Sequence, residues 1–322
     1  MGRRTTSEQL SLKELEQKFL ADDAPAASAS QLRQLGRDPR AGARRLYQRL
    51  KNRLVREKKE QDRLEAMLHF EGLLWKAGIE RIAGVDEVGV GPMAGPVVAA
   101  AVVLRPGTLI EGVDDSKKLD SETRRSLDVL IRRNSLEVSI GAVEPKEIDR
   151  LNIYHAGIRS MWLAVTGLGE APQHILVDSR TIPDLPQPQN SFTKGDGICF
   201  SIACASIVAK VYRDRLMIDM DRTYPGYGFA KHKGYCTPAH QEAIRRLGPC
   251  PTHRRSFDFI RELRGEYGEL FYDLKKKVQE AKSREQLSAW ETEFQAARRQ
   301  LFTVEGKKLR VLATRRWKRA VE

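Results

Sequence analysis

IAGVDEVGVGPMAGPVVAAAVV, residues 82–103, is the stretch around which the chain is organised. Two runs of small and β-branched residues, 82–88 and 96–104, predict two strands joined by a glycine-rich loop, Gly89–Gly95. Asp86 and Glu87 stand inside the first run. Because unpaired charge is costly to bury, these acids either lie at an exposed strand end or are neutralised by a cation.

The composition indicates a globular protein without a membrane span. The chain has 322 residues, of which 41% are hydrophobic, enough for one large core or two modest ones. It contains no run of about 18 uncharged apolar residues, and its start, MGRRTTSEQLSLKE, lacks the apolar segment of a secretion signal. The four cysteines show no CxxC spacing, so we expect reduced thiols and a cytoplasmic location.

Positive charge is concentrated in the two ends of the chain. The formal net charge of +13 divides into +5 for residues 1–80, +3 for residues 81–257 and +5 for residues 258–322. A basic excess favours polyanionic partners through counterion release. Charge runs are more often solvated helix faces, however, and the excess alone does not decide between the two.

Both ends have helical periodicity. Ser11 with Glu14 predicts a capped helix start, and residues 39–77 predict a second, highly charged helix after a small-residue linker at 24–30. We therefore expect residues 1–80 to form a helical N-terminal extension and residues 258–322 a basic helical C-terminal extension. Each is either a solvated structure with a narrow packing face or a module that contacts nucleic acid.

The middle of the chain, residues 81–257, mixes strand and helix patterns, which favours an α/β domain. Beyond the first two strands, the pattern predicts strands at 136–143 and 174–177. It predicts helices at 121–133, 145–168, 200–222 and 237–247.

Four acids in this domain are candidate ligands for a divalent cation: Asp86, Glu87, Asp178 and Asp196. Each lies at a predicted strand end or helix start, where an Asp is more often a turn former or a helix cap. If the four converged they would repel one another unless a cation shared the site. Mg²⁺ prefers hard oxygen ligands of this kind.

A set of motifs, taken together, resembles bacterial ribonuclease HII. They are GVDEVGVGPMAGPVVAAAV, DDSKKL, EPKEIDRLNI, LVDS, KGD, SIACASIVAKVYRDR, YPGYGFAKHKGY and THRRSF, in this order. The resemblance covers about residues 70–257, and the N-terminal extension is more weakly similar to that of longer members. Two small departures are Ser179 and Cys204, where the family commonly has Gly and Ala.

The resemblance implies a ribonuclease H-like fold, with a mixed five-stranded sheet flanked by helices. It implies cleavage of the RNA strand of RNA–DNA hybrids, and cleavage at single ribonucleotides in duplex DNA, to give 3′-hydroxyl and 5′-phosphate ends. It makes Asp86, Glu87, Asp178 and Asp196 the catalytic, metal-binding residues for two Mg²⁺ or Mn²⁺ ions. Side chains alternate along a strand, so Glu87 needs a strand end or a bulge to join Asp86, or contributes through its backbone carbonyl.

The resemblance also implies a substrate-binding surface. The family reads the 2′-hydroxyl with a Gly-Arg-Gly turn, which is Gly89-Val90-Gly91 here, so the glycines are kept and the arginine is missing. Tyr235 matches the tyrosine that stacks on the deoxyribose after the ribonucleotide; the alternative is ordinary half-buried packing. Residues that either contact phosphate or carry solvated surface charge include Lys117, Lys118, Lys194 and Arg254.

Three hypotheses follow. The first is an active, metal-dependent ribonuclease that acts on RNA–DNA hybrids and ribonucleotide-containing duplex DNA, with no membrane association and no evident obligate protein partner. The second is a hybrid-binding protein of the same fold that cleaves weakly because Val90 replaces the arginine. The third, the related ribonuclease HIII class, is disfavoured because GPMAGPV is the HII-like form of the turn.

Overall fold

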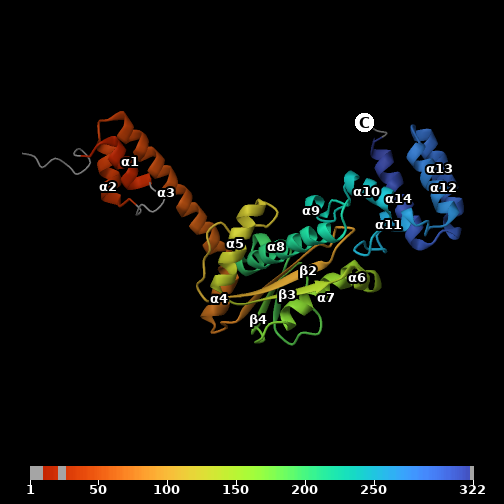
Figure 1. Ribbon diagram of the computed structural model, residues 1–322, viewed down its shortest axis with the longest axis horizontal. Helices are drawn as coiled ribbons and strands as arrows, with labels where there is room; N and C mark the ends of the chain where they lie inside the picture. The colour runs from red at the N-terminus through yellow and green to blue at the C-terminus, as the bar shows by residue number, and fades with distance from the viewer. Residues whose placement is uncertain (1–9, 21–26, 320–322) are drawn as a thin grey trace, which may run out of the picture. The chain divides into compact units, whose positions relative to one another are not determined.

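The computed structural model describes residues 10–20 and 27–319 of the chain (Figure 1). The chain divides into two compact units. The first comprises residues 1–86, 100–140 and 164–211, and the second comprises residues 87–99, 141–163 and 212–322. The division into 1–80, 81–257 and 258–322 that the sequence suggests stays a prediction.

The five-stranded sheet confirms the expected architecture. Its order is β3-β2-β1-β4-β5, and β1 pairs in parallel with β4, which pairs in parallel with β5. The strands are β1 (Ile82–Val88), β2 (Val97–Leu104), β3 (Ser135–Val143), β4 (His174–Asp178) and β5 (Gln189–Phe192). The first two coincide with the strands predicted from residues 82–104, and every residue of β2 is buried.

The edge strand β5 was not predicted. The pattern in this region is polar, and Asn190 and Ser191 are exposed. Of its four residues only Phe192 is apolar, and it packs against the cluster that includes Ile82 and Leu176. One apolar residue gives no alternation, so periodicity does not find the strand. Here the strand is defined by its hydrogen bonds to β4 instead.

The first turn of α8 (Phe200–Thr223) lies directly on β1. A Cβ atom at Gly84 would be 2.2 Å from the carbonyl carbon of Ser201, so only a glycine permits this approach. Glu71, on α4 (His69–Lys76), holds the same turn from another side. Its buried carboxylate accepts hydrogen bonds from the Ser201 amide (2.8 Å) and hydroxyl (2.6 Å).

Helix α4 packs with the strands rather than with the helices that precede it. Its side chains Phe70, Leu74 and Trp75 contact a cluster that includes Ile82 and Leu176. The predicted helix over 39–77 is therefore two helices, α3 (Ala41–Met67) and α4, with a break at Leu68. Because burial raises the pKa of Glu71, this packing also carries an energetic cost.

The N-terminal helices α1 (Leu12–Leu20), α2 (Ala29–Arg37) and α3 form a bundle with its own small core (Figure 1). Ser11 and Glu14 cap α1 reciprocally, as predicted, with the Ser11 amide 2.7 Å from the Glu14 carboxylate. Ser28, in the predicted linker, caps α2, which the sequence did not predict. Residues 24–26 of that linker lie outside the described residues, and its last two residues, Ala29 and Ser30, already belong to α2.

The helix predicted over 145–168 is also broken, into α6 (Pro145–Leu151) and α7 (Ile153–Thr166). Asn152, between them, has a φ of 70°, which ends the first helix. Its side chain then accepts hydrogen bonds from the amides of Tyr154 and His155 and so begins the second. The other helices are α5 (Ser121–Asn134), α9 (Phe229–His232), α10 (Pro238–Leu247), α11 (Asp258–Leu263), α12 (Glu269–Glu280), α13 (Arg284–Ala297) and α14 (Thr303–Arg319), with short 3₁₀ turns at Gly195–Gly197 and Arg298–Gln300.

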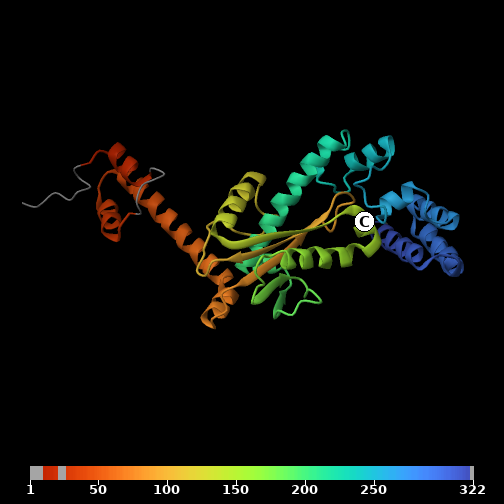
Figure 2. The ribbon, with the colours of Figure 1, turned by 60° about the horizontal axis from the view of Figure 1, so that its bottom comes forward.

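Helices α12, α13 and α14 pack together as a helical module (Figure 2), which confirms the helical character predicted for this end of the chain. Across residues 10–20 and 27–319, no helix combines the length and the apolar character that crossing a membrane requires.

Candidate active site

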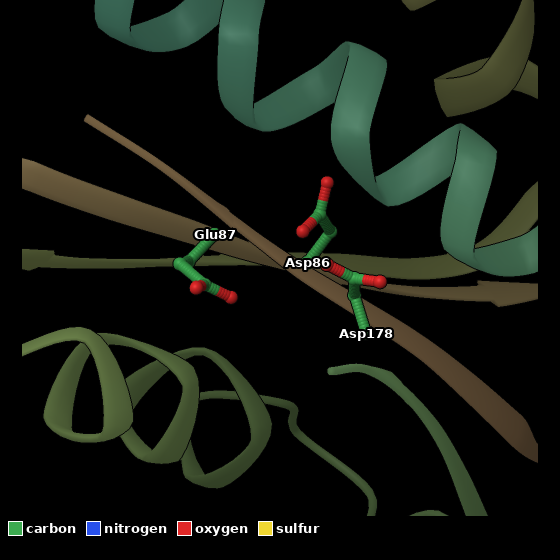
Figure 3. Close-up of side chains that lie close together, drawn as sticks. All are labelled: Asp86, Glu87 and Asp178. Carbon is green, nitrogen blue, oxygen red and sulfur yellow. The ribbon is translucent and has the colours of Figure 1, made fainter. Parts of the chain in front are cut away.

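Three carboxylates meet at one end of the sheet (Figure 3). Asp86 and Glu87 come from β1 and Asp178 is the last residue of β4, and one oxygen of each lies within 4.8 Å of the others. The strands explain this meeting. β1 and β4 are parallel, and Val85 lies opposite Val177, so the residue that follows each valine reaches the same edge of the sheet.

Glu87 joins the group although it is adjacent to Asp86 on a strand. It is the next-to-last residue of β1, and at a strand end the strict alternation of side chains between the two faces can be lost. Figure 3 shows the two side chains leaving the strand in different directions, with Asp178 reaching toward them from the neighbouring strand. Asp86 is buried and Glu87 is half-buried, so the cluster lies at the border between core and solvent.

Hydrogen bonds from two neighbouring residues orient Asp178. One carboxylate oxygen accepts from the Gly195 amide (2.6 Å) and the other accepts from the Ser179 hydroxyl (2.9 Å). Ser179 has a φ of 64°, a conformation that favours glycine, which accounts for the glycine common at this position in the family. Asp196, the fourth predicted ligand, follows Gly195 in the chain, but it is not among the carboxylates that meet within 4.8 Å of one another.

Asp196 is buried and forms an ion pair with Lys117, at 3.1 Å from the ammonium nitrogen. Burial lowers the pKa of Lys117, but the carboxylates of Asp196, Asp115 and Asp86 outweigh it and raise the pKa overall. Lys117 therefore lies within electrostatic reach of both Asp86 and Asp196. The phosphate contact predicted for Lys117 remains a prediction, and its described partners are acids.

The donor set fits a divalent metal ion. Carboxylate oxygens are the ligands that Mg²⁺ and Mn²⁺ prefer, and three of them already lie within 4.8 Å of one another. Carboxylates at this separation repel, and two of the four acids are buried. A bound cation removes that repulsion, which the single ammonium of Lys117 offsets only in part.

The turn after the acids is held by a buried arginine. The guanidinium of Arg254 donates to the carbonyl oxygens of Gly89 (2.5 Å), Val90 (3.1 Å), Pro92 (2.5 Å) and Gly95 (2.9 Å). The side chain is 0% exposed, and burial lowers its pKa to about 9. The guanidinium of Arg254 thus donates its hydrogen bonds to the backbone of the turn. We predicted a phosphate contact for Arg254, whereas this geometry supports a role in positioning the turn.

A second buried arginine, Arg213 on α8, was not predicted. It donates to the carbonyls of Pro96 (2.9 Å), Ala94 (3.2 Å) and Lys233 (3.1 Å). The signal that could have found it is helical spacing, because Arg213 falls four residues from Ala209 and from Met217, both apolar and both buried. Together the two arginines fix the path of residues 89–96.

Tyr235 lies beside the glycine turn. A Cβ at Gly91 would be 3.6 Å from the Tyr235 ring, which is 48% exposed, so the structure brings these two predicted substrate contacts together with an open aromatic face. Val90, between the glycines, is also partly exposed.

Two basic residues that were predicted to contact phosphate remain. Lys118 pairs with Asp114 (2.9 Å). Lys194 is exposed, has a φ of 60° and lies two residues before Asp196.

Two buried histidines connect to the backbone of Tyr235. His240 donates from Nδ1 to the Tyr235 carbonyl (2.9 Å), so its Nε2 is an acceptor, 3.1 Å from Nε2 of His253. Nδ1 of His253 in turn accepts from the Cys250 amide (2.9 Å). Each imidazole is thereby held neutral in one tautomer, and burial lowers the pKa of both to about 4.

The sheet and its edge cluster of acids define a metal-dependent nuclease of the ribonuclease H fold. Ribonuclease H2 from Pyrococcus horikoshii shares this fold, with a TM-score of 0.51 and 27% identity over 58% of this chain and 98% of that one. The family model for ribonuclease HII matches residues 83–260, and the model for the ribonuclease HII N-terminal domain matches residues 11–75.

Among similar proteins, ribonuclease HII of Myxococcus xanthus is 48% identical over 258 residues, covering 80% of this chain and 88% of that protein. Ribonuclease HII of Geobacillus thermodenitrificans is 45% identical, covering 80% and 98% respectively. The chain belongs to the ribonuclease HII family.

Replacing Arg254 with lysine is expected to destabilise the protein by about 3 kcal/mol. A single ammonium cannot reach four carbonyls, and each buried group left without a partner costs about 1–3 kcal/mol. Urea denaturation measures the loss. The matched control is Arg255→Lys, at an exposed neighbour, which is expected to change stability by less than about 0.5 kcal/mol. Equal losses for both variants would contradict the role assigned to Arg254.

The histidine pair predicts a loss of stability in acid. The unfolded histidines bind protons below about pH 6.5, whereas the folded pair stays neutral down to about pH 4. Stability is therefore fully present above pH 6.5 and falls as the pH drops toward 4, by on the order of 3 kcal/mol per histidine at most. Denaturation at pH 7, 5.5 and 4.5 tests this. The double variant His240→Leu/His253→Leu should have a flatter profile, and an unchanged profile would rule the pair out as its source.

Proposed function

We propose that this protein is an endoribonuclease that cleaves the RNA strand of RNA–DNA hybrids, and the strand carrying single ribonucleotides in duplex DNA. The observation that carries the proposal is the convergence of Asp86, Glu87 and Asp178 within 4.8 Å at the sheet edge of a ribonuclease HII family member. The lack of a membrane-spanning helix in the described residues is consistent with a cytoplasmic location.

We propose that Asp86, Glu87, Asp178 and Asp196 hold two divalent ions, Mg²⁺ or Mn²⁺. When bound, such ions would supply activation of a water molecule and stabilisation of the leaving oxygen. The oxygen of water forms a bond to phosphorus and gives up one proton, the bond between phosphorus and the 3′ oxygen breaks, and the 3′ oxygen takes up one proton. The products are a 3′-hydroxyl and a 5′-phosphate.

The residues of the chain orient this site before substrate arrives. The Gly195 amide and the Ser179 hydroxyl fix the Asp178 carboxylate, and Lys117 holds Asp196. The turn Gly89-Val90-Gly91, braced by Arg254, is proposed to meet the 2′-hydroxyl in the minor groove. Tyr235 beside it is proposed to stack on the neighbouring sugar, and Lys118 and Lys194 to contact phosphates. For the N-terminal extension we retain the two alternatives, a packing module or a nucleic-acid contact.

The first test is Asp86→Asn, which keeps the shape of the side chain and removes its charge. We expect cleavage of a duplex with one ribonucleotide, in Mg²⁺ or Mn²⁺, to fall by more than about 100-fold, since even residues that only support metal ligands cost 10–100-fold. Binding of the same duplex should persist.

The control for that test is Asp184→Asn, the same substitution in an exposed loop, which should cleave normally. Retained turnover in Asp86→Asn would refute the metal assignment. Binding without cleavage by the unaltered protein in both metals would favour the second reading, a hybrid-binding protein that cuts weakly.

A second test addresses Val90. Val90→Arg restores a guanidinium at a partly exposed position of the turn, where a charged hydrogen bond to phosphate contributes about 1.5 kcal/mol, or roughly tenfold in affinity. The gain should appear as a lower KM for the single-ribonucleotide duplex. Val129→Arg adds the same charge at an exposed valine of α5 and controls for net charge. No difference between the two variants would show that the side chain at position 90 does not contact substrate.

A further inference from the structure

We infer that the exposed face of α14 is a second binding surface for duplex nucleic acid. This inference rests on the proposed function in one respect: it takes duplex nucleic acid as the partner. Residues 261–322 lie beyond the match to the ribonuclease HII model, which ends at residue 260. The family therefore assigns no role to this module.

The module is a folded unit with a hydrophobic core of its own, although Phe302 and Val311 remain exposed. Phe271, Leu274, Trp290 and Phe294 are at most 3% exposed, and the indole of Trp290 donates to the Leu274 carbonyl at 2.7 Å. Helix α14 contributes its apolar side to this core, through residues that include Leu309 and Ala313. Its opposite side is exposed, and Lys307, Val311 and Arg315 on that side line a pocket together with Asp258, Phe259 and Glu262 of α11.

That displayed side is basic. Its members are exposed and recur at helical spacing: Lys307, Arg310, Val311, Thr314, Arg315 and Lys318. We call the four cations Lys307, Arg310, Arg315 and Lys318 the basic face. Lys318 lies 11 residues after Lys307, so the helix advances about 16 Å between them. A duplex carries about ten phosphates along that length.

The cations of the basic face lack carboxylate partners in the part of the chain that the structure describes. The one acid of α14, Glu305, is buried and accepts from the amides of Gly268 and Phe302, both at 2.9 Å. Elsewhere in the module a lysine does have carboxylate partners: Lys277 of α12 pairs with Asp273 (2.8 Å) and Glu293 (2.5 Å).

Unpaired cations three residues apart repel one another along a helix. Lys307 with Arg310 and Arg315 with Lys318 have this spacing. Phosphates relieve the repulsion. An anionic membrane surface is disfavoured, because a helix that lies on lipid needs a large exposed apolar face, and the apolar side of α14 is covered by α12 and α13.

The experiment compares two variants of the full chain with equal charge. The face variant carries Lys307→Gln, Arg310→Gln, Arg315→Gln and Lys318→Gln. The matched variant carries Lys276→Gln, Lys277→Gln, Lys282→Gln and Arg284→Gln, at exposed positions of the same module outside α14. Glutamine is a good helix former, so both should keep the thermal unfolding midpoint of the unaltered protein within a few degrees.

The readout is the affinity for an all-DNA duplex, measured by fluorescence anisotropy without divalent metal between 50 and 200 mM salt. Four lost phosphate contacts should lower the slope of log K against log salt by up to about 3.6 in the face variant, at about 0.9 per contact. The matched variant should change the slope by less than about 1. Equal slopes for the two variants would overturn the inference, because only net charge would then matter.

Two further outcomes decide the alternatives. Binding of the unaltered protein to phosphatidylserine vesicles, lost in the face variant while the duplex slope is unchanged, would make the partner a membrane and refute the proposal. Single-turnover cleavage at saturating enzyme should be equal in the unaltered protein and the face variant. Failure of the unaltered protein to cleave would refute the proposed function, yet the salt slopes would still decide whether α14 binds duplexes.

Discussion

The parallel register of β1 against β4 is the constraint on which the site depends. With Val85 opposite Val177, Asp86 and Asp178 arrive at the same edge of the sheet from positions 92 residues apart in the chain. A slip of one residue would turn one of the two acids to the other face. Ile175, Leu176 and Val177 of β4 and their partners on β1 are buried, and Gly84 allows α8 to lie against β1. Packing in the core thus determines the geometry of charges at its border.

The glycine turn is likewise held in place by buried residues. A loop that must expose its backbone to a ligand has few side chains with which to hold itself, and its carbonyls need partners. Arg254 and Arg213 supply these partners from beneath, with seven bonds to carbonyl oxygens between them. Fixing the turn from its buried side leaves the outer side, with Gly91 and Tyr235, available for contact.

Much of this could be predicted from sequence, for identifiable reasons. The strands of residues 82–104 carry a strong apolar pattern, and the acids are conspicuous inside or just after such patterns. Elements were predicted wrongly or missed for two kinds of reason, a local backbone conformation and pairing with another strand. Asn152 breaks a helix through its own backbone conformation, and β5 is a strand because β4 lies next to it. The partners that the structure gives Lys117 and Arg254 could not be predicted, since a basic residue looks alike in sequence whether it binds an acid, a carbonyl or a phosphate.

The bond between Glu71 and Ser201 spans 130 residues. It has a consequence for the order in which the protein is made. On a ribosome, which adds about 5–20 residues per second, α4 is synthesised well before α8. The Glu71 carboxylate therefore has no Ser201 to bind until α8 has been made. Asp86 likewise precedes Asp178 and Asp196. The contact between α8 and β1 therefore forms only late in synthesis, and a nascent chain that ends before residue 178 carries Asp86 and Glu87 without Asp178, Asp196 or α8.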